Sequence, residues 1–184
     1  MATPKIAVNF YSTYGTNYGI ASVAAKAAEE AGAEVRVLRI AETAPPEVVE
    51  GQDAWKAQAE RVSELPVVTP DDLKWADGYF LSSPTRYGGM ASQTRAWLDT
   101  LGPLWMEGAL ANKTITVTAS AQNVNGGTEG AIQQTYVSAM HFGMFGFLCA
   151  LLYRTGKHKT GAAKSFHWGI NILLGVLSLV VVGY

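Results

Sequence analysis

The chain has 184 residues, which is enough for one domain with a proper core or for one domain with an appendage. Its formal net charge of −1 argues against nucleic acid as a partner, and its single cysteine, Cys149, excludes an intrachain disulfide and favours a reducing compartment. The first residues lack the pattern of a signal peptide, so we expect a cytoplasmic protein. Composition shifts along the chain, because no acidic residue follows Glu129 and the remainder is basic and apolar.

The stretch from Lys5 to Gly19 predicts a strand, a polar loop and the start of a helix. Strand-favouring residues run as far as Tyr11, and the next six positions, Ser12 to Asn17, offer hydroxyl, amide and backbone N–H groups. Apolar residues then recur at helical spacing. Unpaired N–H groups and the positive end of the helix dipole make such a loop a receptor for a phosphate monoester. An ordinary capped helix start would use the same residue types.

The glycines of this loop do not follow a G-x-G-x-x-G or a G-x-x-x-x-G-K pattern, which argues against a dinucleotide loop or a Walker ATP loop. Next come a second strand at 33–40 and a polar insertion at 41–65, with a short helix around Trp55 to Val62. Thr69, Pro70 and Asp72 predict the capped start of another short helix.

The same strand, loop and helix unit recurs twice downstream. The predicted segments are strand 78–82, loop 83–89 and helix 91–100, then strand 114–118, loop 119–127 and helix 128–141. Repeated units of this kind predict an α/β fold with a doubly wound parallel sheet, whose loops converge on one crevice at the carboxyl ends of the strands.

The three loops together suggest a ligand with a phosphate at one end and a planar ring at the other, such as FMN. The first loop supplies phosphate donors, the second combines Arg86, Tyr87 and glycines, and the third supplies amide groups. No G-x-S-x-G element points to a serine nucleophile. The histidines at 141, 158 and 167 have no metal-ligand spacing, so we expect no metal site.

With these loops placed, the chain resembles the WrbA-type NAD(P)H:quinone oxidoreductases, a flavodoxin-like family that uses FMN. The resemblance runs from about Lys5 to Met144 and rests on YSTYGTNY, PTRYGGMASQTRAWLD with the following GPLWMEGAL, GGTE, and AMHFGM. It implies the flavodoxin-like strand order 2-1-3-4-5.

The resemblance also implies site residues. The phosphate loop would be Ser12, Thr13, Tyr14, Gly15, Thr16 and Asn17, and the ring-contacting loop would be Pro84, Thr85, Arg86, Tyr87 and Gly88. The third loop aligns with Ser120, Ala121, Gln122, Asn123, Val124, Asn125 and Gly126, where SAQNVNG replaces a run rich in Ser, Thr and Gly. His141 matches a histidine that approaches the flavin from a neighbouring subunit, and Tyr14 and Trp105 match aromatic residues beside the nicotinamide and quinone site.

The activity implied is two-electron reduction of a quinone by NAD(P)H through FMN, in a homo-oligomer, a tetramer by resemblance. Arg86 would stabilise negative charge on the ring, and Tyr14 or His141 would supply a proton, as the catalytic residues. The alternative, from a different class of protein, is a flavodoxin-type electron carrier or FMN-binding module without enzymatic activity. The long insertion and Trp105 favour the enzyme, because a simple carrier needs no nicotinamide pocket.

The resemblance divides the chain into an FMN-binding domain at 1–144 and an atypical apolar and basic tail at 145–184. Met144 to Tyr153 is a candidate fifth strand, while two apolar stretches around a basic turn, 154–164, form the pattern of a membrane hairpin, so the tail is a candidate for membrane contact. The tail is also similar to a fragment of the cytochrome b five-six-one family, in which His167 would match a haem ligand. A fusion, a mis-joined reading frame or a domain that fails to fold are the other interpretations.

Overall fold

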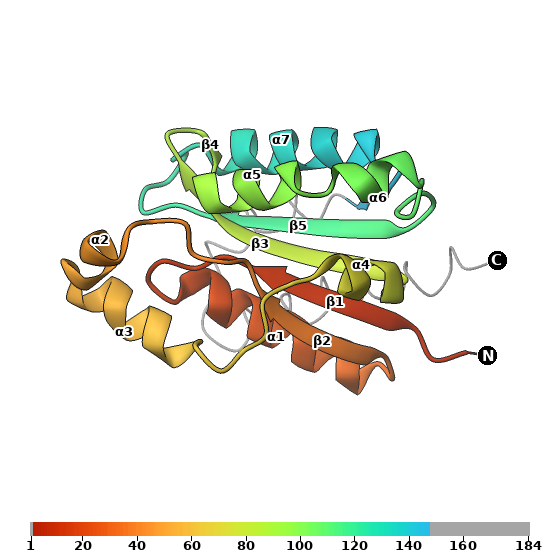
Figure 1. The fold of residues 1–184 in the computed structure, drawn as a ribbon, viewed down its shortest axis with the longest axis horizontal. Coiled ribbons are helices and arrows are strands. Elements are labelled where there is room, and N and C mark those ends of the chain that lie inside the picture. The colour runs from red at the N-terminus through yellow and green to blue at the C-terminus, as the bar shows by residue number, and fades with distance from the viewer. Residues whose placement is uncertain (1, 148–184) are drawn as a thin grey trace.

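The computed structural model describes residues 2–147, which form a twisted parallel sheet with helices on both faces (Figure 1). In chain order the elements are β1 (Lys5–Phe10), α1 (Thr16–Glu30), β2 (Glu34–Arg39), α2 (Pro46–Glu50), α3 (Asp53–Arg61), α4 (Pro70–Trp75), β3 (Gly78–Arg86), β4 (Gly89–Met90), α5 (Ser92–Asp99), α6 (Gly102–Met106), β5 (Thr114–Ser120), α7 (Thr128–His141) and β6 (Phe145–Phe147).

The strand order of the sheet is β2-β1-β3-β5-β6, and every neighbouring pair on this path is parallel. This order confirms the predicted arrangement 2-1-3-4-5, because the two-residue β4 lies off the path and pairs antiparallel with β3. The fifth parallel strand, expected between Met144 and Tyr153, is present as β6 and pairs with the start of β5.

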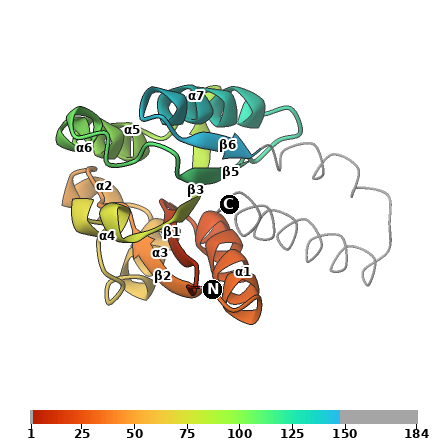
Figure 2. The ribbon, with the colours of Figure 1, turned by 90° about the vertical axis from the view of Figure 1, so that its right-hand side faces the viewer.

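Alternating side chains of β1 divide the core into two layers, as the pleat of a strand requires. Ile6, Val8 and Phe10 pack against the alanine-rich face of α1, while Ala7 faces the layer formed with α4, α5 and α7. Figure 2 shows α1 on the opposite side of the sheet from α5 and α7. The alanines that recur at helical spacing in the sequence therefore form the side of α1 that covers one face of the sheet.

The structure departs from the sequence expectation in three places. The insertion at 41–65 contains two helices, α2 and α3, instead of one. The short α6, which has proline in its first turn, was not predicted. The loop expected from Ser83 is wrong for its first half, because β3 continues to Arg86 and turns back into β4. Of the two glycines that suggested a loop, Gly88 forms the two-residue turn with Tyr87, and Gly89 begins β4.

A capping box starts α4, as the sequence predicted. The Thr69 hydroxyl accepts a hydrogen bond from the Asp72 N–H, and the Asp72 carboxylate accepts one from the Thr69 N–H. Asp72 also pairs with Arg36 at 2.8 Å, and the Arg36 guanidinium lies 3.9 Å from the centre of the Trp75 ring. Burial works to raise the pKa of Asp72, but the hydrogen bonds from Thr69 and the Arg36 charge outweigh it and hold this pKa below its usual range.

Replacing Asp72 by asparagine should therefore destabilise the fold by about 1–2 kcal/mol at neutral pH. Because the pKa of Asp72 is lower in the folded protein than in the unfolded chain, the ionised carboxylate stabilises the fold at pH values above the unfolded pKa. This stabilisation is lost as the pH falls through the folded pKa. The difference in the free energy of unfolding between wild type and D72N, measured by urea unfolding, should thus become smaller below about pH 4. Asp71→Asn, which removes the same charge from an exposed neighbour in the same turn, is the control, and an equal loss there would contradict the capping argument.

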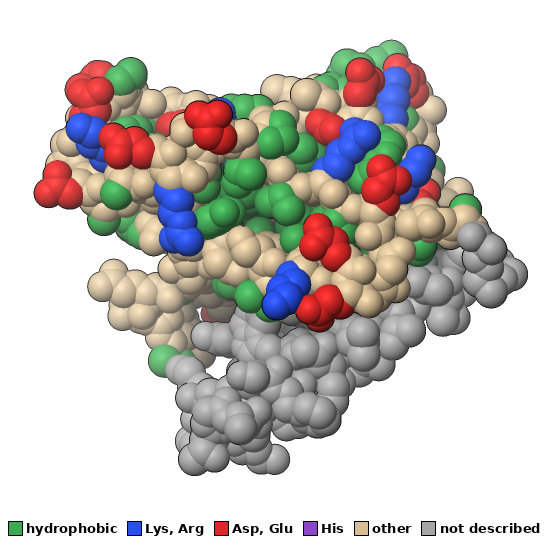
Figure 3. Space-filling view, turned by 90° about the horizontal axis from the view of Figure 1, so that it is seen from below, with side chains coloured by type: hydrophobic (Ala, Val, Ile, Leu, Met, Phe, Trp, Pro, Cys, Tyr) green, Lys and Arg blue, Asp and Glu red, His purple; other side chains and the backbone are tan. Residues whose placement is uncertain are grey.

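The surface of the described part mixes both signs of charge. In Figure 3, Lys and Arg side chains are interspersed with Asp and Glu around a group of hydrophobic side chains, and neither sign forms a continuous stripe on that face. Within residues 2–147 no helix is long and apolar enough to cross a membrane. The predicted membrane hairpin and the haem-ligand match at His167 fall outside the described residues.

Candidate functional site

The candidate site lies at the edge of the sheet where the carboxyl ends of β1, β3 and β5 meet. Three connections gather there: the loop Ser12–Gly15, the β3–β4 hairpin, and the segment between β5 and α7, all toward the left of the view in Figure 1. This is the edge at which doubly wound sheets bind ligands. The convergence of loops predicted from the sequence is confirmed as an arrangement in space.

The first loop leaves the start of α1 open to an anion. Gly15 precedes the helix with a φ of 93°, and no side chain within the described residues caps it. The first turn of α1 contains no acidic residue, and the Ser12 hydroxyl accepts a 3.1 Å hydrogen bond from the Gly15 N–H. Hydroxyls, backbone N–H groups and the positive helix end together form a donor set that fits a phosphate monoester.

Asn17 ties this loop to the two neighbouring strands. Its side chain is buried, its Oδ1 accepts a 3.0 Å hydrogen bond from the Ser82 hydroxyl, and its Nδ2 donates one of 2.9 Å to the Ser120 hydroxyl. The amide of Asn17 is thus used within the protein, which leaves its backbone N–H as the group available to a ligand. Ser120, predicted in the third loop, is joined to the first loop by the same contact.

The second connection is a tight hairpin instead of an open loop. Tyr87 and Gly88 have φ angles of 50° and 83°, a pair of positive values typical of a two-residue type I′ turn. The Tyr87 side chain is fully exposed at this tip. Pro84 and Thr85 are buried in β3, while Arg86 turns toward the first loop, where its Nη2 donates a 2.7 Å hydrogen bond to the Thr13 hydroxyl.

Glycines allow this hairpin to lie directly on the N-terminus of α7. The Thr85 hydroxyl donates to the Gly127 carbonyl oxygen at 3.0 Å. A Cβ atom added to Gly127 would overlap the backbone of Gly88, and one added to Gly130 would overlap the Gly88 carbonyl oxygen. Gly127 and Gly130 of the G-G-T-E-G run are therefore required by close backbone approach between the hairpin and the start of α7.

The third connection is mostly open to solvent. Gln122, Asn123, Val124 and Asn125 are exposed, Ala121 and Gly126 are partly buried, and the turn closes through a hydrogen bond from the Gly126 N–H to the Asn123 carbonyl. These side chains make no hydrogen bond to the other two loops within residues 2–147. Their amide and backbone groups border the edge at which the site lies.

Two of the predicted residues lie away from this edge within a single chain. His141 is the last residue of α7, about 20 Å along the helix from its N-terminus at 1.5 Å per residue. Trp105 lies in α6, which Figure 1 shows at the opposite end of the sheet from β4, and the Lys74–Glu107 ion pair ties that end of α6 to the helix before β3. One chain brings together Tyr14, Arg86 and the three connections, but not Trp105 or His141.

Sequence reasoning missed Glu42, a carboxylate that joins the first loop to its surroundings. It accepts hydrogen bonds from the Tyr11 hydroxyl, the Trp55 indole and the Gln93 amide. Burial works to raise the pKa of Glu42, but these bonds and one from the Ala44 N–H outweigh it and lower this pKa, so Glu42 is ionised at neutral pH. Its position just beyond the second predicted strand, at the carboxyl edge, was the available signal.

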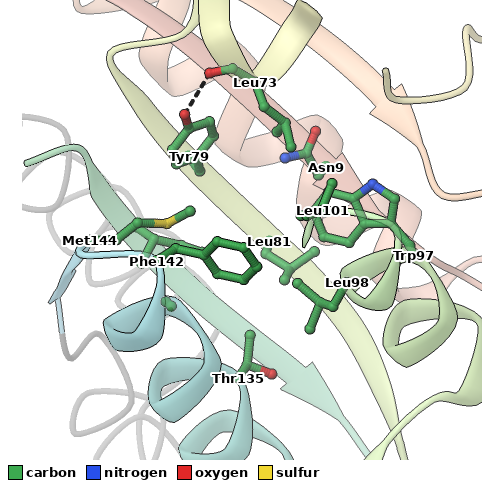
Figure 4. Close-up of a pocket in the computed structure, with 12 residues that line it drawn as sticks. Asn9, Leu73, Tyr79, Leu81, Trp97, Leu98, Leu101, Thr135, Phe142 and Met144 are labelled. Carbon is green, nitrogen blue, oxygen red and sulfur yellow. Dashed lines mark hydrogen bonds between the residues drawn. The ribbon is translucent and has the colours of Figure 1, made fainter. Parts of the chain in front are cut away.

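The cavity enclosed between β3, α5 and α7 is too small to be the site. Figure 4 shows a cavity between β3, α5 and α7, with Asn9, Tyr79 and Trp97 among its lining residues, and its volume is about 20 Å³. A cavity of this size has room for about one water molecule. Asn9 Oδ1, which is buried and has no hydrogen-bond partner among the described residues, is a suitable acceptor for it. A flavin-sized ligand must bind at the open edge instead.

A known protein family matches the part of the chain that forms this edge. The family model described as NADPH-dependent FMN reductase matches residues 10–152, which include all three connections. The chain belongs to the NADPH-dependent FMN reductase family. The family match extends past residue 144, where the resemblance noted in the sequence ended.

One named relative supports this membership, and two solved structures share the fold. A protein of Deinococcus radiodurans named NAD(P)H dehydrogenase (quinone) is 49% identical over 166 residues, which cover 88% of this chain and 83% of the relative. A flavodoxin, WrbA-like protein from Agrobacterium tumefaciens has a TM-score of 0.62 at 16% identity, with 98% of each chain covered. A flavoenzyme NAD(P)H:(acceptor) oxidoreductase from Paracoccus denitrificans has a TM-score of 0.67 at 16% identity, covering 99% of this chain and 100% of that one. The fold of this family member is flavodoxin-like, as expected.

Proposed function

We propose that this protein is an FMN-dependent oxidoreductase that transfers two electrons from NAD(P)H to a quinone. The family and the relative named NAD(P)H dehydrogenase (quinone) support the reaction. The observation that supports the cofactor is the uncapped start of α1, where the Ser12 hydroxyl and backbone N–H groups lie at the same edge as Arg86, which is bound to Thr13. A flavodoxin-type electron carrier remains the alternative, and nicotinamide turnover distinguishes the two.

The three connections would divide the work of holding FMN. Ser12 to Asn17 would bind the phosphate, Pro84 to Gly88 would lie along the ring, and Ser120 to Gly126 would border its other edge. Bound FMN would supply reversible two-electron chemistry. Arg86 would place a positive charge beside the ring, and the Tyr14 hydroxyl, which donates a 2.7 Å hydrogen bond to Gln52, would be held at the mouth of the site as a proton donor.

A homo-oligomer, tetrameric as the WrbA resemblance implies, forms part of this proposal. Trp105 is 58% exposed and His141 is also exposed, and both lie far from the site of their own chain. They would therefore line the nicotinamide and quinone pocket only from a neighbouring copy. We further propose that residues 1–144 form the FMN-binding domain, which β6 completes at the sheet edge. Location in the cytoplasm and any membrane contact of the tail stay predictions from the sequence.

The full-length protein should bind FMN and then oxidise NADH or NADPH at a rate that depends on added benzoquinone. The measurement is a fluorescence titration of FMN into the apo-protein, followed by the loss of nicotinamide absorbance with and without the quinone. Protein without FMN is the control and should be inactive. Tight FMN binding with no oxidation of either nicotinamide would contradict the enzyme and support the electron carrier.

A further inference from the structure

Glu42 lies at the start of the insertion, and its carboxylate accepts an unusual number of hydrogen bonds. Both of its oxygens are used, and all of the partners are donors. Oε1 accepts from Gln93 Nε2 at 2.7 Å and from the N–H groups of Thr43 and Ala44 at 2.9 Å, while Oε2 accepts from the Tyr11 hydroxyl at 2.9 Å and Trp55 Nε1 at 3.0 Å. Five donors favour the ionised carboxylate, because a protonated carboxyl group would give up acceptor capacity to its own O–H.

Three of these donors come from elements that are distant in the sequence. Tyr11 follows β1 and directly precedes the first loop, Trp55 belongs to α3 in the insertion, and Gln93 belongs to α5. Glu42 therefore fixes the position of the residue from which the first loop departs. No part of the proposed FMN site contacts Glu42 directly, so its effect on the ligand must pass through the residues that it binds, which are Tyr11 and, by way of Trp55, helix α3.

A chain of hydrogen bonds joins the second connection to Glu42 through Thr13 and Tyr11, and each group in it donates toward Glu42. Arg86 Nη2 donates to Thr13 Oγ1 at 2.7 Å, Thr13 Oγ1 donates to the Tyr11 hydroxyl at 3.5 Å, and that hydroxyl donates to Glu42. Each hydroxyl accepts from one neighbour and donates to the next, so the order of donors is set by its two charged ends. A group at position 42 that could donate would break this order at its end.

The helix that follows Glu42 supports the same loop from a second side. Gln52 and Gln58 lie on the face of α3 that includes Trp55, since residues three apart are neighbours on a helix. Gln52 accepts the hydrogen bond from the Tyr14 hydroxyl, and the buried side-chain oxygen of Gln58 lies 3.1 Å from where a Cβ on Gly15 would stand. The insertion thus contacts the first loop at Tyr14 and Gly15, in addition to the contact of Glu42 with Tyr11.

We propose that Glu42 is a positioning residue, which holds the loop Ser12–Asn17 and Arg86 in the arrangement that binds a phosphate monoester. The inference rests on the proposed function only for the identity of its ligand, FMN. Glutamine at position 42 has the same shape but a single acceptor oxygen, so its amide would face donors such as Trp55 Nε1, which cannot accept. If the loop samples other conformations, its apparent affinity for the phosphate falls in proportion to the fraction of molecules in the binding conformation.

The test compares Glu42→Gln and Tyr11→Phe with Glu47→Gln, an exposed glutamate of the same insertion whose side chain makes no hydrogen bond within the described residues. We expect E42Q to weaken FMN binding to the full-length apo-protein by about tenfold and Y11F by several-fold, with E47Q unchanged. The independent readout is amide hydrogen exchange in the apo-protein. Exchange should accelerate in the peptide that contains 12–17 for E42Q and Y11F, and stay unchanged in β5.

The outcomes separate this inference from the proposed function. If wild type fails to bind FMN, the proposed function fails, while exchange in the first loop still tests Glu42. Lower thermal stability of E42Q with unchanged loop exchange and unchanged FMN affinity would show a purely structural role and overturn the inference. Y11F removes a single hydroxyl and keeps the ring, so it gives the same test if E42Q does not fold.

Discussion

Replacing Gly130 by alanine should weaken FMN binding by about tenfold or more, although the residue lies on a helix where alanine is normally favourable. The added methyl group would overlap the carbonyl oxygen of Gly88, a backbone atom that cannot move without shifting the hairpin. Forcing a group into a packed contact costs about 1–3 kcal/mol. Since Arg86 and Tyr87 stand on that hairpin, the strain should appear in the ligand site. FMN titration of the apo-protein together with urea unfolding measures both effects.

Gly19→Ala is the matched control, because Gly19 lies in the first turns of α1 and an added Cβ there meets no atom within 4 Å. We expect G19A to stabilise the protein by about 0.5–1 kcal/mol, the usual helix gain, and to leave FMN affinity unchanged. If G130A binds FMN as tightly as wild type, the close contact between hairpin and α7 is not what shapes the site. If G130A is too unstable to titrate while G19A is stable, the contact between the hairpin and α7 is needed for folding.

Much of the fold could be predicted because glycines and caps mark element ends. Gly127 and Gly143 enclose α7, whose bounds Thr128–His141 match the prediction, and the capping box at Thr69 and Asp72 was predicted residue by residue. The parallel order followed from repeated strand and helix units, since few connections of that kind are sterically allowed. Local chemistry was sufficient for these features.

The β3–β4 hairpin shows why prediction from the local sequence failed at other elements. Consecutive glycines at 88 and 89 predict a loop, but only Gly88 lies in the turn, which it forms with Tyr87, so the strands continue on both sides. A single sequence does not distinguish these cases, because what decides is the support that Gly127 and Gly130 give the hairpin from another element. The same limit applies to the proposed site.

Glu42 was missed because its partners are separated from it by 31, 13 and 51 positions in the chain. A carboxylate that binds several donors is recognisable only when those donors are placed around it, and secondary-structure propensity carries no such information. Trp105 and His141 present the reverse case, since motif resemblance predicted a role that one chain alone does not assemble. Motifs identify residue types, whereas the topology decides which of them can meet.

Replacing Asn17 by aspartate should separate the phosphate site from the ring site. The carboxylate keeps the shape of the amide, still accepts from the Ser82 hydroxyl, and can accept from Ser120 once that hydroxyl turns to donate. The fold should therefore persist, and a negative charge in the first turn of a helix is favourable. Two like charges about 6 Å apart repel by about 3 kcal/mol at an effective dielectric constant of about 20, so FMN binding should weaken by about a hundredfold.

Riboflavin, which lacks the phosphate, provides the internal comparison, and its affinity for N17D should equal its affinity for wild type. Asn112→Asp is the matched control, because it adds the same charge at an exposed turn before the amino end of β5 and should leave FMN affinity unchanged. Equal losses of FMN and riboflavin binding in N17D would mean that the loop had moved as a whole. Unchanged FMN binding in a folded N17D would place the phosphate away from the start of α1, and the donor-set argument for the cofactor would fail.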